Sequence, residues 1–198
     1  MLLQIKKFSA KLLQPLAKKL VKVPANIITL LGLISAVVTF IGFIFNFLIM
    51  IIIFLFITEF FDQLDGVVAR LQGPTKLGAF YDSTLDRIGD FFIFFGVILS
   101  GYTNVVIGII ALFGAFLTSY TRAKIEALGV DNLYGIGIIE RTDRVPIFFI
   151  GAILQIWFVD AIWWTMVFLV IFSIITVLQR MIYAYRKFSS KEKKDENS

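Results

Sequence analysis

The chain has 198 residues with a net charge of +5, and 59% of its residues are hydrophobic. Soluble domains are about 45–50% apolar, so this composition excludes an ordinary soluble protein and favours an integral membrane protein. The sequence contains neither cysteine nor histidine. This excludes disulfide bonds, iron–sulfur clusters, zinc sites that use those residues, and catalysis by histidine.

Residues 1–22 form the first predicted element. Lysines such as Lys6, Lys11 and Lys18 are interleaved with large apolar side chains, mostly leucine. This pattern is typical of a basic amphipathic helix that lies in the membrane interface, and Pro15 is expected to kink it or make it restart. Anionic lipids and membrane topology account for the positive charge, so we expect no nucleic-acid partner.

Six apolar runs follow, at residues 27–45, 47–61, 88–101, 103–121, 145–159 and 161–178. Several are shorter than a bilayer requires, and they reach spanning length only if polar segments continue the same helices. The sequence therefore predicts an all-α integral membrane protein whose transmembrane catalytic domain, residues 23–188, has six helices. The second and third helices should project beyond the membrane as a polar lobe. Residues 189–198 are predicted to be a disordered charged tail.

The charges predict the orientation of these helices. All 19 lysine and arginine residues fall within residues 1–26, 70–87, 122–144 and 180–194. An even number of spans places these four zones on one face of the membrane. By the positive-inside rule this face is cytoplasmic, so we expect both termini inside the cell.

Four aspartates flank the predicted turn at Gly73–Pro74. Asp62 and Asp65 are three residues apart on the second span, and Asp82 and Asp86 are four apart on the third. Such spacings place each pair on one helix face, and the hairpin can bring the two faces together. Four carboxylates suit Mg²⁺ or Mn²⁺. The alternative is that these acidic residues are merely solvated at helix ends.

The order Asp62-x-x-Asp65-Gly66-x-x-Ala69-Arg70, followed by Gly78-x-x-x-Asp82-x-x-x-Asp86, resembles the signature of the CDP-alcohol phosphotransferase family. Members are six-span membrane enzymes that transfer a phosphatidyl-type group from a CDP-activated lipid to a small alcohol and release CMP. Residues 24–29, PANIIT, are similar to the family's nucleotide-binding Pro-Asn-x-x-Thr stretch, although they could simply start the first span.

The resemblance implies roles for individual residues. The ligands of two divalent cations, Mg²⁺ or Mn²⁺, would be Asp62, Asp65, Asp82 and Asp86. The general base would be Asp86, and Asp90, one turn further along, would support the site. The residues that bind the CDP-lipid would be Asn26, Thr29, Asp65, Gly66, Ala69, Arg70, Gly78 and Asp82. The resemblance also implies the cytoplasmic membrane of a prokaryote, a cytoplasmic active site and a homodimer.

A basic cluster near the predicted cavity mouth indicates the acceptor. Its members are Arg122, Lys124, Arg141, Arg144 and Arg180. The positive-inside rule explains their side of the membrane, but an acceptor that bears phosphate explains their number better. The wording around them is similar to family members that use inositol 1-phosphate, the phosphatidylinositol- and archaetidylinositol-phosphate synthases. Glycerol 3-phosphate is the second candidate acceptor.

Two other classes of protein compete with an enzyme. A cation-coupled transporter would also place aspartates in its membrane helices, but near the bilayer midplane and on broken helices. A scaffold or dimerisation module would explain the apolar spans and leave the aspartates without a purpose. The sequence does not distinguish ester-linked from ether-linked lipid chains in the donor.

Overall fold

The protein is all-helical over residues 2–130, 133 and 135–195, the part of the chain that this computed structural model describes. Its helices are α1 (Leu2–Lys19), α2 (Ala25–Ile44), α3 (Leu48–Gln72), α4 (Lys76–Leu99), α5 (Val105–Ala127), the 3₁₀ helix η1 (Arg141–Asp143), α6 (Arg144–Leu154) and α7 (Ala161–Asp195). The predicted all-α class is confirmed.

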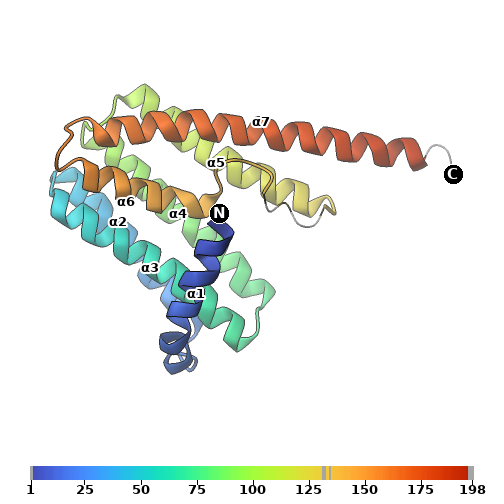
Figure 1. Ribbon diagram of the computed structural model, residues 1–198, viewed down its shortest axis with the longest axis horizontal. Helices are drawn as coiled ribbons and strands as arrows, with labels where there is room; N and C mark the ends of the chain where they lie inside the picture. The colour runs from blue at the N-terminus through green and yellow to red at the C-terminus, as the bar shows by residue number, and fades with distance from the viewer. Residues whose placement is uncertain (1, 131–132, 134, 196–198) are drawn as a thin grey trace.

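The helices form two groups, one of α2, α3 and α4 and the other of α5 and α7, and both groups contribute to one hydrophobic core. The most extensive contacts join α2 to α3, α2 to α4, and α5 to α7 (Figure 1). The C-terminal end of α7 extends beyond the other helices (Figure 1), whereas Tyr183, Ala184 and Phe188 still pack against the cluster that contains Ile125 of α5. It continues to Asp195, into the segment expected to be a disordered tail, while residues 196–198 lie outside the described residues.

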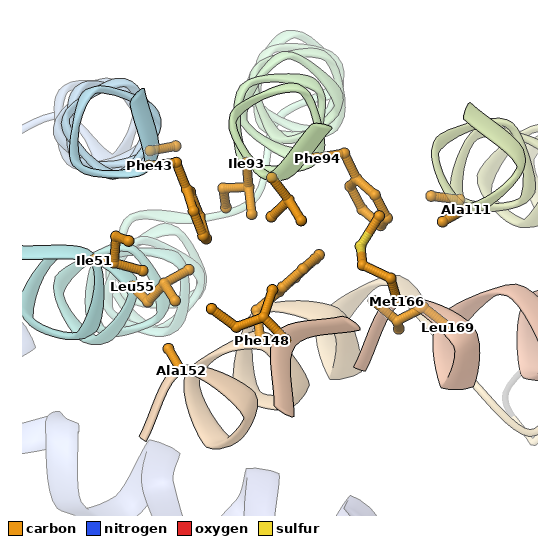
Figure 2. Packing of buried hydrophobic residues seen from close by; sticks show 14 of the residues in the cluster. Phe43, Ile51, Leu55, Ile93, Phe94, Ala111, Phe148, Ala152, Met166 and Leu169 are labelled. Carbon is orange, nitrogen blue, oxygen red and sulfur yellow. The ribbon is translucent and has the colours of Figure 1, made fainter. Parts of the chain in front are cut away.

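Aromatic and aliphatic side chains fill the space between the two groups (Figure 2). Phe43 of α2, Leu55 of α3, Phe94 of α4, Phe148 of α6 and Met166 of α7 are all at most 2% exposed. The rings of Phe94 and Phe148 meet edge to face with their centroids 5.0 Å apart. This cluster fixes α6, which begins at Arg144 and follows Arg141 of η1, against α4, which carries Asp82 and Asp86.

Small residues let the helix backbones approach closely. A Cβ atom at Gly96 of α4 would lie 3.0 Å from the Cβ of Phe43, and one at Gly114 of α5 would lie 3.0 Å from the Cβ of Ser173. Close approach of this kind is common between membrane helices, where packing replaces the hydrophobic effect as the source of association.

Helix α1 packs on the last turns of α3. Ala17 is fully buried, and its cluster includes Leu64, Val67 and Val68 of α3. The predicted amphipathic helix is therefore present, and part of its apolar face contacts protein. It runs through Pro15 as one helix, so it does not restart there.

Within the part of the chain that the structure describes, three helices are long and apolar enough to cross a membrane: Ala25–Ile44, Val105–Ala127 and Ala161–Ser189. The fifth apolar run, at residues 145–159, contains a helix shorter than the run itself, because α6 ends at Leu154. The side chain of Gln155 closes the turn by accepting a hydrogen bond from the backbone N–H of Ile162 at 2.9 Å. With 11 residues, α6 is about 16 Å long, roughly half the thickness of the hydrocarbon layer.

Candidate active site

The turn between α3 and α4 sets the relative position of the aspartates. Gly73 has φ +90°, a conformation that favours glycine, and Pro74 follows it. The Thr75 hydroxyl accepts a hydrogen bond from the Gly78 N–H at 3.0 Å and caps α4. The chain therefore reverses here into a hairpin, as the sequence predicted, and α2 packs against both of its helices.

Three of the four predicted metal ligands converge across this hairpin. Carboxylate oxygens of Asp62, Asp82 and Asp86 all lie within 4.8 Å of one another. Asp65 is not in that group, but it lines the cavity next to it and is 3% exposed. Its Oδ2 atom is buried and has no hydrogen-bond partner among the described residues.

The electrostatics of the cluster match a cation site. Asp65 and Asp82 lie in the polar parts of α3 and α4, beyond the apolar runs. Burial raises the pKa of Asp65 to about 8, and the charge of Asp62 adds to the rise. Burial also raises the pKa of Asp82, against the opposing effect of Arg141. A divalent cation would reverse these shifts. The buried, unpartnered oxygen and the all-carboxylate donor set fit Mg²⁺ or Mn²⁺.

A second, larger cavity of about 640 Å³ opens beside the aspartates. It is lined by all eight residues predicted to bind the CDP-lipid, namely Asn26, Thr29, Asp65, Gly66, Ala69, Arg70, Gly78 and Asp82. Helices α2, α3 and α4 all contribute to its wall. A Cβ atom at Gly78 would lie 3.7 Å from Asn26 Oδ1, so the start of α2 stands close to the start of α4.

Sequence reasoning missed Gln72, which holds this cavity together. Its side-chain N–H groups donate to the carbonyls of Val21 and Val23 at 2.9 and 2.6 Å. Its side-chain oxygen accepts from the Ala25 N–H at 3.2 Å. Gln72 thus ties the start of α2 to the end of α3. No local pattern reveals this role, because the partners are about 50 positions away in the sequence.

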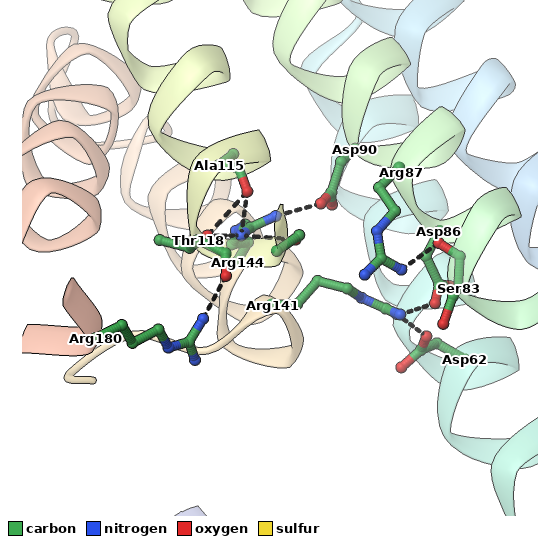
Figure 3. Close-up of polar contacts among 11 residues, drawn as sticks. Asp62, Ser83, Asp86, Arg87, Asp90, Ala115, Thr118, Arg141, Arg144 and Arg180 are labelled. Atoms are coloured by element: carbon green, nitrogen blue, oxygen red, sulfur yellow. Dashed lines mark hydrogen bonds and ion pairs between the residues drawn. The ribbon is translucent and has the colours of Figure 1, made fainter. Parts of the chain in front are cut away.

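Arg141 lies among the acidic residues. Its guanidinium contacts Asp62 Oδ1 through one nitrogen and Asp86 Oδ2 through another (Figure 3). The side chains of Arg141 and Asp62 are 23% and 22% exposed. Arg141 therefore lies between the carboxylate cluster and the open side of the cavity.

Arg144 is placed very differently, although it was predicted to share the same role. It is 1% exposed and donates to Asp90, to the Ala115 carbonyl at 2.7 Å, and to the hydroxyls of Thr118 and Ser119 (Figure 3). This environment argues against the predicted role of Arg144 as an acceptor ligand. Arg144 instead joins α6 to α4 and α5.

The other three basic residues surround the segment between α5 and α6. Arg122 pairs with Glu126 at 3.0 Å and with Glu140 at 3.7 Å, and Lys124 is exposed. Arg180 is 2% exposed and donates to the backbone carbonyls of Ile136 and Thr118. Arg122 is thus accessible, whereas Arg180 is largely committed to the fold.

Comparison with known proteins gives a consistent result. The sequence pattern of the CDP-alcohol phosphatidyltransferase family matches residues 22–175. The archaetidylinositol phosphate synthase of Methanothermobacter thermautotrophicus is 35% identical over 192 residues, which cover 94% of this chain and 95% of that protein. The phosphatidylinositol phosphate synthase of Cutibacterium acnes is 33% identical over 205 residues, covering 91% of this chain and 96% of its own.

Solved structures show the same similarity. The phosphatidylinositol phosphate synthase of Mycobacterium tuberculosis with CDP-DAG bound has a TM-score of 0.76 and 28% identity, covering 88% of this chain and 94% of its own. The same enzyme in complex with manganese and citrate has a TM-score of 0.75 and 29% identity, covering 87% of this chain and 88% of its own.

Proposed function

This chain belongs to the CDP-alcohol phosphatidyltransferase family, and we propose that it transfers the lipid phosphate of a CDP-activated lipid to a phosphorylated inositol. Membership makes it a phosphotransferase close to the inositol-phosphate phospholipid synthases. The finer assignment of donor and acceptor rests on the cavity, the carboxylates and the basic residues described above. Membership of a phosphotransferase family also sets aside the transporter and the scaffold.

The observation that carries the proposal is that the carboxylate cluster and the large cavity lie next to each other. A carboxylate cluster suited to divalent cations opens directly onto a cavity lined by all eight residues expected to hold the donor. Asp82 belongs to both, and Asp65 lines the large cavity as well as the pocket that holds Asp62 and Asp86, so a diphosphate in the large cavity would lie against the cation site. Divalent cations bound there would neutralise the diphosphate charge and stabilise the charge that develops as CMP leaves.

The chain's own residues would then perform the transfer. The acceptor hydroxyl oxygen forms a bond to the phosphorus next to the lipid. The bond from that phosphorus to the diphosphate's bridging oxygen breaks, and CMP leaves with the electron pair. Asp86 takes the hydroxyl proton, since it lies in the carboxylate cluster and the sequence offers no histidine. Gln72 and the start of α2 keep the donor cavity in shape.

Positive charge beside the carboxylates supports a phosphorylated acceptor. Arg141 at the cluster and Arg122 beside Glu126 and Glu140 are partly exposed, and guanidinium groups bind phosphate through paired N–H groups. The curated relatives named above are inositol phosphate synthases, so inositol 1-phosphate is the proposed acceptor. Glycerol 3-phosphate would use the same charges, and the experiment below separates the two.

The membrane arrangement is part of the proposal. We propose that α2 to α7 are the six predicted spans, with α6 the shortest, and that the hairpin end of α3 and α4 faces the cytoplasm with both termini. A soluble phosphorylated acceptor would then meet a membrane-bound donor at the inner leaflet. The complete restriction of lysine and arginine to four zones supports this orientation.

Acceptor competition tests the proposal. Purified protein in lipid nanodiscs receives CDP-diacylglycerol or CDP-archaeol with Mg²⁺, and separate samples contain inositol 1-phosphate, glycerol 3-phosphate, serine or free inositol. We expect CMP release with inositol 1-phosphate, its loss on adding EDTA, and its recovery with excess Mg²⁺ or Mn²⁺. CMP release only with free inositol or serine would overturn the phosphorylated acceptor, and release unaffected by EDTA would overturn the cation site.

A further inference from the structure

Arg141 contacts the candidate general base itself. One guanidinium nitrogen contacts Asp86 Oδ2, and another contacts Asp62 Oδ1 of the cation cluster (Figure 3). The Asp86 side chain is 8% exposed, so little water reaches it. A carboxylate oxygen in this contact is not available to take a proton from an attacking hydroxyl group. The same contact occupies an oxygen that a divalent cation would use.

The anchoring of Arg141 lets its side chain leave without disturbing the backbone. Its segment is fixed by a capping box, in which the Glu140 N–H donates to Asp143 at 2.8 Å, and by the buried Arg144 that follows. The partners of the Arg141 guanidinium, by contrast, are two carboxylates at the edge of the cavity. The Arg141 side chain is 23% exposed, so a competing anion can reach the guanidinium and replace these carboxylates.

A phosphate group is such an anion. The donor's diphosphate is expected in the large cavity, which Arg141 does not line, whereas the phosphate of the acceptor would approach the pocket that Arg141 lines with Asp62 and Asp86. A guanidinium that turned from Asp86 and Asp62 to the acceptor phosphate would free the base and a cation ligand together. Water carries no phosphate and would leave the contact in place.

We propose that Arg141 is a latch on Asp86 that the phosphate of the acceptor releases, and that it thereby favours the acceptor over water as nucleophile. This inference rests on the proposed function. The reaction it suppresses is hydrolysis of the donor. In that reaction the oxygen of water bonds to the phosphorus next to the lipid, CMP leaves with the electron pair of the broken bond, and Asp86 receives the proton. The products are CMP and the lipid phosphate.

The first test measures binding rather than turnover. Mn²⁺ is titrated into protein in nanodiscs without donor, and free Mn²⁺ is followed by electron paramagnetic resonance. Arg141→Gln removes the competing charge, so we expect Mn²⁺ to bind about 3- to 5-fold more tightly than in the wild type. Arg122→Gln is the matched control, because Arg122 pairs with glutamates away from the aspartates, and its Mn²⁺ affinity should equal that of the wild type.

Thermodynamic coupling gives a second binding measurement. If phosphate removes Arg141 from the carboxylates, inositol 1-phosphate should tighten Mn²⁺ binding in the wild type, while free inositol should not. In Arg141→Gln this tightening should disappear, which also corrects for any direct binding of Mn²⁺ by inositol 1-phosphate. Equal tightening in both proteins would overturn the latch.

The third measurement is the ratio of hydrolysis to transfer. Wild-type protein should release little CMP from the donor without acceptor. Arg141→Gln should release more CMP without acceptor while its transfer to inositol 1-phosphate falls, and Arg141→Lys, which keeps the charge, should be intermediate. An unchanged ratio in Arg141→Gln would overturn the latch, provided that circular dichroism shows the wild-type helix content. If the wild type releases no CMP with any acceptor, the proposed function fails, whereas the Mn²⁺ titrations still decide whether Arg141 competes for the carboxylates.

Discussion

Two ion pairs of the same composition connect α4 to the start of α6, one turn apart. Arg141 pairs with Asp86, and Arg144 pairs with Asp90 (Figure 3). In the outer pair the arginine side chain is 23% exposed, and in the inner pair it is 1% exposed. One turn of depth therefore separates a pair at the edge of the reaction cavity from a pair that belongs to the protein core.

The partners around each arginine explain the difference in role. Arg144 also donates to a backbone carbonyl and two hydroxyl groups, which replace the water that it lost on burial. Among the described residues, Arg141 contacts carboxylates that are expected to bind cations. Breaking a fully buried pair costs about 3–5 kcal/mol, and a pair whose arginine is partly exposed costs less to break. The inner pair is suited to holding the fold and the outer pair to exchanging partners.

The largest expected effect is a loss of turnover when Asp86, the aspartate of the outer pair, is replaced. Asp86→Asn should lower kcat for CMP release by about 10²- to 10⁴-fold, because it removes the general base, while the thermal unfolding midpoint stays at or above that of the wild type. Turnover is measured with saturating donor and inositol 1-phosphate. Wild-type kcat in Asp86→Asn would contradict the assignment of the base.

The next largest effect is on the free energy of unfolding, which should depend on the Arg144–Asp90 pair far more than on the Arg141–Asp86 pair. Arg144→Met should lower the free energy of unfolding by about 3–5 kcal/mol, because Asp90 is left buried and charged without a partner. The double variant Asp90→Leu, Arg144→Met should lose less than the sum of the two single losses. Unfolding in detergent micelles is followed by circular dichroism. Arg141→Gln is the matched control, and a loss there as large as in Arg144→Met would contradict the contrast between the pairs.

A smaller effect concerns the acceptor. Arg122→Ala should raise the KM for inositol 1-phosphate by roughly 10-fold or more, since a hydrogen bond to a charged group contributes about 1.5–3 kcal/mol. The KM for the CDP-lipid should change far less. Steady-state kinetics with each substrate varied in turn measures both. Equal increases for the two substrates would argue against an acceptor site at Arg122.

The smallest expected effect lies on the donor side. Gln72→Glu keeps the shape of the side chain but cannot donate to the carbonyls of Val21 and Val23. We expect the KM for the CDP-lipid to rise about 5-fold, the equivalent of about 1 kcal/mol in total, with the KM for inositol 1-phosphate unchanged. A rise confined to the acceptor would contradict the positioning role of Gln72.

Much of this site was predictable from local spacing. The intervals between Asp62 and Asp65, and between Asp82 and Asp86, follow the helix repeat, and Gly73–Pro74 marks the turn that pairs them. The resemblance to a known family added the donor residues, and the structure gathers all eight of them around one cavity.

The burial of individual arginines, and contacts between residues far apart in the sequence, were not predictable. Arg141 and Arg144 are three residues apart, so the sequence places them on one helix face with the same role. Only the packing of α4 and α5 against α6 decides that Arg144 is buried against Asp90, which lies 54 positions earlier. The end of α6 at Leu154 was missed for a similar reason. Residues 155–159 are as apolar as the helix before them, and a side chain, Gln155, closes the turn.

The central claim is that carboxylates from α3 and α4 together bind divalent cations. Mn²⁺ titration followed by electron paramagnetic resonance tests it most directly, on the wild type, Asp62→Asn, Asp82→Asn and the control Asp160→Asn, whose exposed carboxylate lies between α6 and α7. We predict that Asp62→Asn and Asp82→Asn each lose most Mn²⁺ binding and that Asp160→Asn retains it. Equal Mn²⁺ binding by all four proteins would contradict the claim.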